Sequence, residues 1–259
     1  PPPEPPAMAD QPAWNPSDKD GDVTLSNGNR TWQQVSGTVG AVRSAVGLSS
    51  GRWRVQLTQI TANGSACRHG FATASHALAT APGNSAQSWA INGQGSLEHG
   101  GATGSDYANF ANGAVVQLYV DIDAGRIWYG DASGPLAGDP AAGTGAMHSV
   151  TPGTTLYLAG GMDGGGSSRG GTLRLLADYT GTPPAGFTDG WGGGAVGVEL
   201  AAGGGAVAAV GRTATLRAGI GVRSPAGSTP LAVAGAAGAV ATGVDRKSTR
   251  LNSSHATLS

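Results

Sequence analysis

The 259-residue sequence predicts an all-β fold: an antiparallel β-sandwich followed by a small, Gly/Ala-rich β-segment. Three observations predict this class. Apolar residues recur at every second position in short runs, which is the period of a half-buried strand. Turn-forming Gly, Pro, Asn and Asp separate these runs. No stretch shows the 3.6-residue period of an amphipathic helix, and the helix formers Glu and Lys are scarce.

The first two strands found in this way cover residues 23–25 and 53–58. In the second strand, Trp53, Val55 and Leu57 alternate with polar neighbours. A period of two places these three side chains on one face and the polar ones on the other. Both strands are therefore predicted to be half-buried, with one face in the core and the other in solvent.

The clearest strand covers residues 116–122, and a turn at 123–125 returns the chain through residues 126–129 as a hairpin. Later strands are predicted at residues 156–158 and 173–177, each bounded by Gly or Pro. The side chains predicted to point into the core are Trp53, Val55, Leu57, Leu118, Val120, Ile122, Leu156, Leu158, Leu173 and Leu175.

Composition divides the chain into four parts. Residues 1–13 form a Pro-rich lead that is expected to be disordered, and residues 14–190 form the sandwich. Residues 192–244 contain no aromatic residue and are rich in Gly and Ala, so a Gly/Ala-rich β-segment that is truncated is expected there. Residues 245–255 read DRKSTRLNSSH, which resembles a DNA sequencing adapter translated in frame. We therefore expect residues 245–259 to be an artefactual tail without function.

Charge and composition exclude several classes of partner. The formal net charge is −1, and no basic cluster predicts binding to nucleic acid. No apolar run approaches the roughly 18–20 residues that a membrane-spanning helix needs. The single cysteine, Cys67, rules out an internal disulfide and is expected to be a small buried thiol.

Two glycine motifs resemble sites of catalysis or cofactor binding but lack the required context. Residues 47–51 fit G-x-S-x-G, the nucleophile turn of α/β-hydrolases, yet a strand follows where that turn needs a helix. Residues 192–197 fit G-x-G-x-x-G, yet no helix follows to direct its N-terminus at a phosphate. No catalytic residue and no cofactor is therefore predicted.

The acidic residues offer two further alternatives. Asp18, Asp20 and Asp22 have the spacing of the first ligands of an EF-hand, but the later ligand positions do not match, so a solvated turn is expected. Asp121 and Asp123 lie on one strand face and could form the carboxylate pair of a glycosidase. Capping of the hairpin end by these side chains is the preferred interpretation.

The histidines and tryptophans give no metal site. No histidine has another His or Cys at a zinc-ligand spacing, so no metal is predicted at His69, His76, His99 or His148. Large aromatic side chains supply much of the burial in a chain that has few of them. The predicted core tryptophans are Trp32, Trp53, Trp89 and Trp128.

Several of these segments, in this order, resemble the SPRY domain, and specifically its bacteriophage and prophage form. The matching segments are residues 14–19, 23–29, 49–57, 116–129, 138–145 and 156–159, which span about residues 14 to 190. Residues 62–112 match only loosely, and Gly130–Ala132 replaces the usual Asn-Gly after the hairpin. The resemblance implies a concanavalin-like sandwich of two antiparallel sheets whose end loops bind partners without catalysis.

The resulting hypothesis is a non-enzymatic recognition module, encoded by a phage or prophage, that binds a protein or a surface glycan. The predicted binding residues combine polar and aromatic groups in the segment that matches the family least: Arg68, His69, Tyr107, Asn109 and Phe110. Two alternatives stay open, a concanavalin-like lectin or glycosidase and a structural component of a virion tail or fibre. The sequence assigns no localisation, and a virion and the bacterial cytoplasm both fit.

Overall fold

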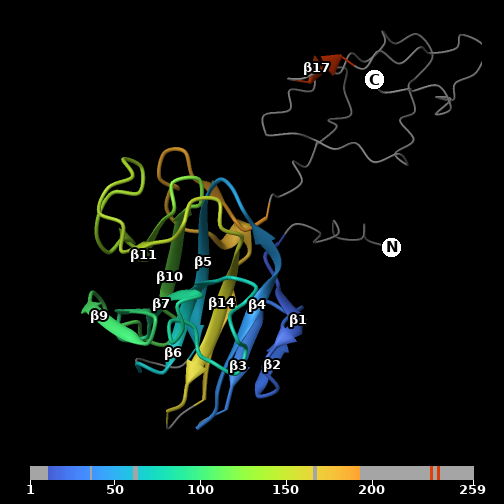
Figure 1. Cartoon of the computed structure of the whole chain (residues 1–259), viewed down its shortest axis with the longest axis vertical. Helices are drawn as coiled ribbons and strands as arrows, with labels where there is room; N and C mark the ends of the chain where they lie inside the picture. The colour runs from blue at the N-terminus through green and yellow to red at the C-terminus, as the bar shows by residue number, and fades with distance from the viewer. Residues whose placement is uncertain are drawn as a thin grey trace, which may run out of the picture. The chain divides into compact units, whose positions relative to one another are not determined.

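The computed structural model describes residues 11–35, 37–60, 64–165, 168–192, 234–235 and 238–239. The chain divides into two compact units, Pro1–Gly194 and Ala195–Ser259. In the first unit two β-sheets pack face to face (Figure 1). This arrangement confirms the predicted antiparallel sandwich. None of the helices in the described part is long and apolar enough to cross a membrane.

Sheet A has seven strands in the order β1-β4-β14-β6-β7-β8-β9, and all of its pairs are antiparallel. Strand β9 lies at its exposed edge (Figure 1). The strands are β1 (Trp14–Lys19), β4 (Val39–Leu48), β14 (Leu156–Asp163), β6 (Cys67–Ala72), β7 (Ser88–Asn92), β8 (Ser96–His99) and β9 (Ala102–Asp106).

Sheet B has nine strands, seven of them in the order β12-β11-β10-β5-β15-β3-β2. These are β12 (Gly134–Pro135), β11 (Arg126–Asp131), β10 (Val115–Asp121), β5 (Arg52–Ile60), β15 (Arg169–Leu173), β3 (Thr31–Gln34) and β2 (Val23–Ser26). Strand β13 (His148–Ser149) pairs with β11, and β16 (Thr188–Asp189) pairs with β5 in parallel. A short 3-10 helix, η1 (Leu176–Asp178), follows β15.

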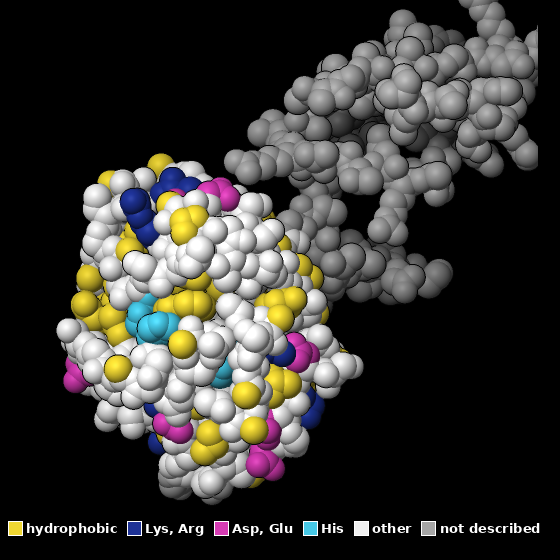
Figure 2. Space-filling model, viewed as in Figure 1, with side chains coloured by type: hydrophobic (Ala, Val, Ile, Leu, Met, Phe, Trp, Pro, Cys, Tyr) yellow, Lys and Arg dark blue, Asp and Glu magenta, His cyan; other side chains and the backbone are white. Residues whose placement is uncertain are grey.

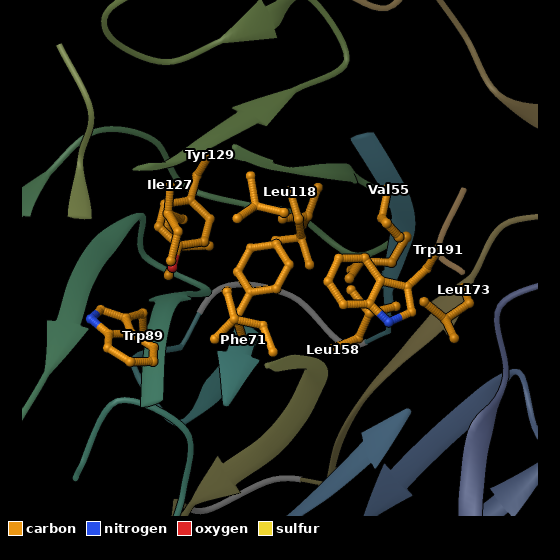
Figure 3. Close-up of a cluster of buried hydrophobic side chains, with 14 of the residues drawn as sticks. Val55, Phe71, Trp89, Leu118, Ile127, Tyr129, Leu158, Leu173 and Trp191 are labelled. Atoms are coloured by element: carbon orange, nitrogen blue, oxygen red, sulfur yellow. The ribbon is translucent and has the colours of Figure 1, made fainter. Parts of the chain in front are cut away.

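The inner faces of the two sheets form one hydrophobic core. Figure 3 shows Phe71, Trp89 and Leu158 of sheet A facing Val55, Leu118 and Tyr129 of sheet B. Of the predicted core residues, Val55, Leu57, Leu118, Val120, Ile122, Leu156, Leu158 and Leu173 are buried, and Trp53 is half-buried against them.

Leu175 was wrongly predicted to point into this core. Strand β15 ends at Leu173, and η1 begins at Leu176, so the alternation of strand side chains stops before Leu175. Leu175 is only half-buried and lies outside the core cluster. The run of leucines after Leu173 therefore belongs to a turn and not to a strand.

The prediction that β5 is half-buried is also wrong, because its polar face is covered as well. Arg54 and Gln56 are buried on this outer face of sheet B. The chain after η1 crosses the face: the Gln56 side-chain amide donates to the Thr180 carbonyl at 2.7 Å and accepts from the Thr180 N–H at 3.0 Å. The segment that returns from η1 to β16 thus forms a partial third layer.

Aromatic side chains divide between the core and this outer layer. Trp32 and Trp89 belong to the core between the sheets, as predicted. Trp128 instead packs on the outer face of sheet B, in a second cluster with Tyr119 and Phe187. The Phe187 ring makes edge contacts with both at 6.1 and 6.3 Å, which anchors the covering segment.

The outer face of sheet A is covered by residues 73–87. Arg43 on β4 donates to the carbonyls of Thr73 and His76 at 3.1 and 2.7 Å, and Arg68 on β6 donates to the Pro82 carbonyl at 3.1 Å. Because both faces of β6 are covered, all six of its residues are buried. At Gly70 a Cβ would lie 2.0 Å from the Trp89 carbonyl oxygen, so this strand tolerates no side chain there.

In the second unit the structure describes only the antiparallel pair of β17 (Ala234–Gly235) and β18 (Gly238–Ala239). The rest of the predicted Gly/Ala-rich β-segment lies outside the described residues. So do residues 1–10 of the Pro-rich lead and the adapter-like tail, residues 245–259.

Candidate functional site

Two of the predicted binding residues, Arg68 and His69, lie in strand β6 and not in an end loop. Arg68 is buried on the outer face of sheet A. It forms ion pairs with Asp163 at 2.7 Å and with Glu98 at 3.7 Å. His69 lies between the sheets, beside the Cys67 thiol at 3.5 Å. Burial lowers the pKa of His69 to about 3. Both side chains are therefore occupied within the fold.

The other three predicted residues follow β9. Phe110 is 2 % exposed and belongs to the core, so its side chain is not accessible to a partner in this fold. Tyr107 is 39 % exposed, and Asn109 is exposed as well. The Tyr107 N–H donates to the Gly95 carbonyl at 3.0 Å, which places this loop along the β7–β8 turn. Tyr107 and Asn109 remain accessible to a partner.

At the end of β8 away from this loop, the inner faces of the two sheets approach the surface at a place that we call the mouth: Trp89, His99, Tyr129, Met147 and His148. His99 on β8 is the cross-strand neighbour of Trp89 on β7, so both side chains lie on the inner face of sheet A. On sheet B, His148 of β13 is opposite Ile127 of β11, which is also a core residue. The two histidines thus come from opposite sheets.

The rings of the mouth form a row that connects the sheets. The Trp89 and His99 rings stack with centroids 5.1 Å apart, and the His99 and His148 rings meet edge to face at 5.9 Å. Tyr129 lies perpendicular to His148 at 5.8 Å. Both histidines are half-buried, and Figure 2 shows histidine side chains at the surface of this face, bordered by hydrophobic ones.

Hydrogen bonds fix both imidazoles. His99 Nδ1 lies 2.9 Å from the Ser88 carbonyl oxygen, and His148 Nε2 lies 3.4 Å from the Ala90 carbonyl oxygen. A carbonyl oxygen only accepts, so each of these nitrogens is the donor. Burial is the main cause that lowers the pKa of His148 to about 4; the hydrogen bond to the Ala90 carbonyl acts in the opposite direction, and the nearby His99 makes a smaller lowering contribution.

Two polar atoms of the mouth lack partners in the described structure: Trp89 Nε1 and the Tyr129 hydroxyl. Burial raises the pKa of Tyr129 well above its ordinary value, so its hydroxyl stays protonated. A buried polar group without a hydrogen bond costs free energy, on the order of 1–3 kcal/mol. The mouth is therefore a place where the fold by itself leaves polar groups unsatisfied.

Sequence reasoning did not select His99 or His148. They are distant in the chain and share no motif spacing, so only the packing of the sheets brings them together. A weak signal was present, since His148 stands at the end of a Gly-rich loop that closes on β11.

The two carboxylates weighed as a glycosidase pair are engaged in the hairpin. Asp121 accepts from the Ala124 N–H at 2.9 Å and pairs with Arg52 at 3.1 Å. Asp123 accepts from the Gly51 N–H at 3.0 Å. Asp121 therefore caps the hairpin end as expected, whereas Asp123 connects that end to the turn before β5.

The other candidate motifs also have structural partners. Asp18 pairs with Arg43 at 2.7 Å, and the Asp22 N–H donates to Asp20 at 2.9 Å. Burial raises the pKa of the Cys67 thiol to about 12, so it is a neutral thiol at pH 7. Within the described ranges, no group of three or more His, Cys, Asp or Glu side chains is arranged to hold a metal ion.

Comparison with solved structures identifies the fold. The SPRY domain of human HERC1 superposes with a TM-score of 0.53 at 15% identity, and the match covers 64% of this chain and all of that domain. The PSpry domain of TRIM65 gives a TM-score of 0.50 at 12% identity over 64% of this chain and 93% of that one. No protein-family model and no curated protein matches the sequence. The sandwich therefore has the fold of SPRY domains.

Proposed function

We propose that the sandwich is a non-enzymatic recognition module that binds a protein partner at the mouth and at the Tyr107–Asn109 loop, which lies at the other end of β8. The observation that carries this proposal is the pair of half-buried histidine rings, His99 and His148, which meet between the sheets beside the buried rings of Trp89 and Tyr129. Elsewhere the outer faces of both sheets are covered by segments of the same chain.

The chemistry of the mouth suits a peptide segment. Aromatic side chains concentrate binding energy when a partner removes them from water, and each such position is worth on the order of 2 kcal/mol. At neutral pH the mouth offers the neutral ring of His148 together with hydrogen-bond donors, and none of its five side chains is an acid, an Arg or a Lys. We therefore favour a partner segment with apolar side chains and exposed backbone carbonyls over an acidic or basic ligand.

Selection from a displayed library of random peptides tests this proposal, because selected peptides bind more often to a recognition surface than to other surfaces of the same protein. We expect selected peptides to bind the full chain and to lose at least tenfold in affinity, about 1.4 kcal/mol, with His99→Ala or Tyr107→Ala. Val35→Ala is the matched control, since Val35 is 57 % exposed beside β3, near the other edge of sheet B. Equal binding to all four proteins, or loss only with Val35→Ala, contradicts the proposal.

A glycan array probed with the same proteins separates a surface glycan from a protein as the natural ligand. Glycan binding that disappears with His99→Ala, together with no selected peptide, would replace the protein partner by a glycan. Hydrolysis of any array glycan that Asp121→Asn combined with Asp123→Asn abolishes would show an enzyme instead of a binding module.

We also propose a phage or prophage origin, which rests on the resemblance of the sequence segments alone. Sequencing the genes beside this one tests it, since tail or baseplate genes are expected there. The same reads test the tail: we expect them to continue past Val244 with a sequence other than DRKSTRLNSSH. Reads that reproduce those residues would make the tail part of the protein.

A further inference from the structure

We infer that the mouth holds a divalent transition-metal ion between His99 Nε2 and His148 Nδ1. This inference goes beyond the proposed function and does not depend on it, because the ion can be titrated without a peptide. It follows from the distance between the two rings, from their tautomers and from their surroundings.

The distance between the rings fits a shared ion. A zinc–imidazole bond is about 2.0–2.1 Å long, so two imidazoles on one ion have ring centres about 5–6 Å apart. The centroids of His99 and His148 are 5.9 Å apart, with the ring planes at 62°. The separation and tilt of the two rings therefore lie within the range expected for two imidazoles bound to one ion.

The hydrogen bonds prepare the nitrogens for this role. His99 donates through Nδ1 to the Ser88 carbonyl, and His148 donates through Nε2 to the Ala90 carbonyl. In neutral imidazole the remaining nitrogen carries a lone pair, which leaves His99 Nε2 and His148 Nδ1 as ligands. Metal-binding histidines commonly donate their other N–H to a backbone carbonyl in this way, which fixes the tautomer and the ring orientation.

The surroundings of the two rings are partly open to solvent. Both histidines are half-buried, so water can reach an ion bound between them. The Tyr129 hydroxyl beside His148 has no partner in the described structure, and a metal-bound water would offer it one. Imidazole ligands suit zinc, copper and nickel, and water completes the coordination of an ion that has two protein ligands.

Isothermal titration of the metal-free full chain with Ni²⁺ and with Zn²⁺ tests the inference. We expect one ion per chain, and at least a tenfold loss of affinity in both His99→Phe and His148→Phe, which keep an aromatic ring in the row. Cu²⁺ added to the unmodified chain should show coupling to two nitrogen ligands in its paramagnetic resonance spectrum, and each variant should show fewer.

The control is His255→Ala, which removes the histidine of the C-terminal tail and should leave the affinity unchanged. The melting temperature of each variant without metal shows whether it folds, and His99→Gln replaces His99→Phe if the latter does not. The inference is overturned if no ion binds, if only His255→Ala weakens binding, or if the folded mouth variants bind the ion as the unmodified chain does.

Discussion

The outer face of sheet B and the mouth both contain polar side chains among aromatic ones, but they use them differently. On the outer face, Arg54 donates to both carboxylate oxygens of Asp189 at 2.6 and 2.9 Å and to the carbonyls of Thr180 and Gly181. At the mouth, Trp89 Nε1 and the Tyr129 hydroxyl bond to nothing in the described structure. Buried polar atoms without a partner also occur elsewhere, among them the Tyr179 hydroxyl in the segment over the outer face, so the half-buried histidines are what distinguishes the mouth.

The largest expected effect comes from breaking the outer-face network with Arg54→Met. Arg54 is 1 % exposed, and its loss leaves Asp189 and two carbonyls without their donor. Removing one partner of a buried ion pair costs about 3–5 kcal/mol. Urea unfolding measures this cost. Arg126→Met is the control, because Arg126 is exposed on β11 of the same sheet, and the variant should stay within about 0.5 kcal/mol of the parent.

If both arginine variants lost the same stability, the covering segment would not depend on Arg54. The hydrogen bonds on the outer face would then contribute no more to stability than bonds at the surface. The comparison between the outer face and the mouth would fail, because it assumes that the outer-face bonds hold the fold together.

A second prediction separates core from surface within one short loop. Phe110→Ala removes a buried ring and is expected to cost about 3 kcal/mol, whereas Tyr107→Ala removes an exposed one and is expected to cost less than about 0.5 kcal/mol. Thermal or urea unfolding of the two variants in parallel measures the difference. Equal losses would mean that Tyr107 is part of the core and unsuited to bind a partner.

A smaller loss of stability is expected when the pH is lowered. Burial lowers the pKa of His148 from 6.5 to about 4, so between these values the unfolded chain takes up a proton that the folded chain refuses. The stabilising contribution of neutral His148 is therefore complete above about pH 6.5 and is lost as the pH falls towards 4. One such proton changes stability by at most about 1.4 kcal/mol per pH unit.

His148→Phe is expected to reduce this acid dependence without removing it. Burial also lowers the pKa of His69 and of His76, and these residues retain their own contributions. Urea midpoints at pH 7.5 and pH 5 measure the slope. A variant whose slope equals that of the parent would show that His148 is not buried in its neutral form.

Sequence alone predicted sheet B better than sheet A, for a physical reason. In β5 and β10 large apolar residues alternate with polar ones, as at Val55 and Leu118, so a period of two identifies the strands. Strand β6 has no such contrast because both of its faces are buried and Gly70 needs close contact with β7. Alternation also could not reveal that Arg54 is buried, because the segment that covers it lies far away in the chain.

The candidate site was predicted only in part. The segment after β9 supplied Tyr107 and Asn109, which are exposed, but polarity alone could not distinguish them from Arg68, whose charge is used inside the fold. The pairing of His99 with His148 depends on how the edges of two sheets meet. No local pattern encodes that meeting, so it could be recognised only from the structure.

The central claim is that stability and binding reside in different regions of this sandwich. The affinity of one selected peptide for His99→Ala and for Arg54→Met, measured at a temperature where both variants are folded, tests it most directly. We expect His99→Ala to bind at least tenfold more weakly while losing no more than about 1 kcal/mol of stability, and Arg54→Met to bind within about twofold of the parent, a difference of about 0.4 kcal/mol. The claim would be contradicted if Arg54→Met lost peptide affinity along with its stability while His99→Ala bound the peptide as tightly as the parent.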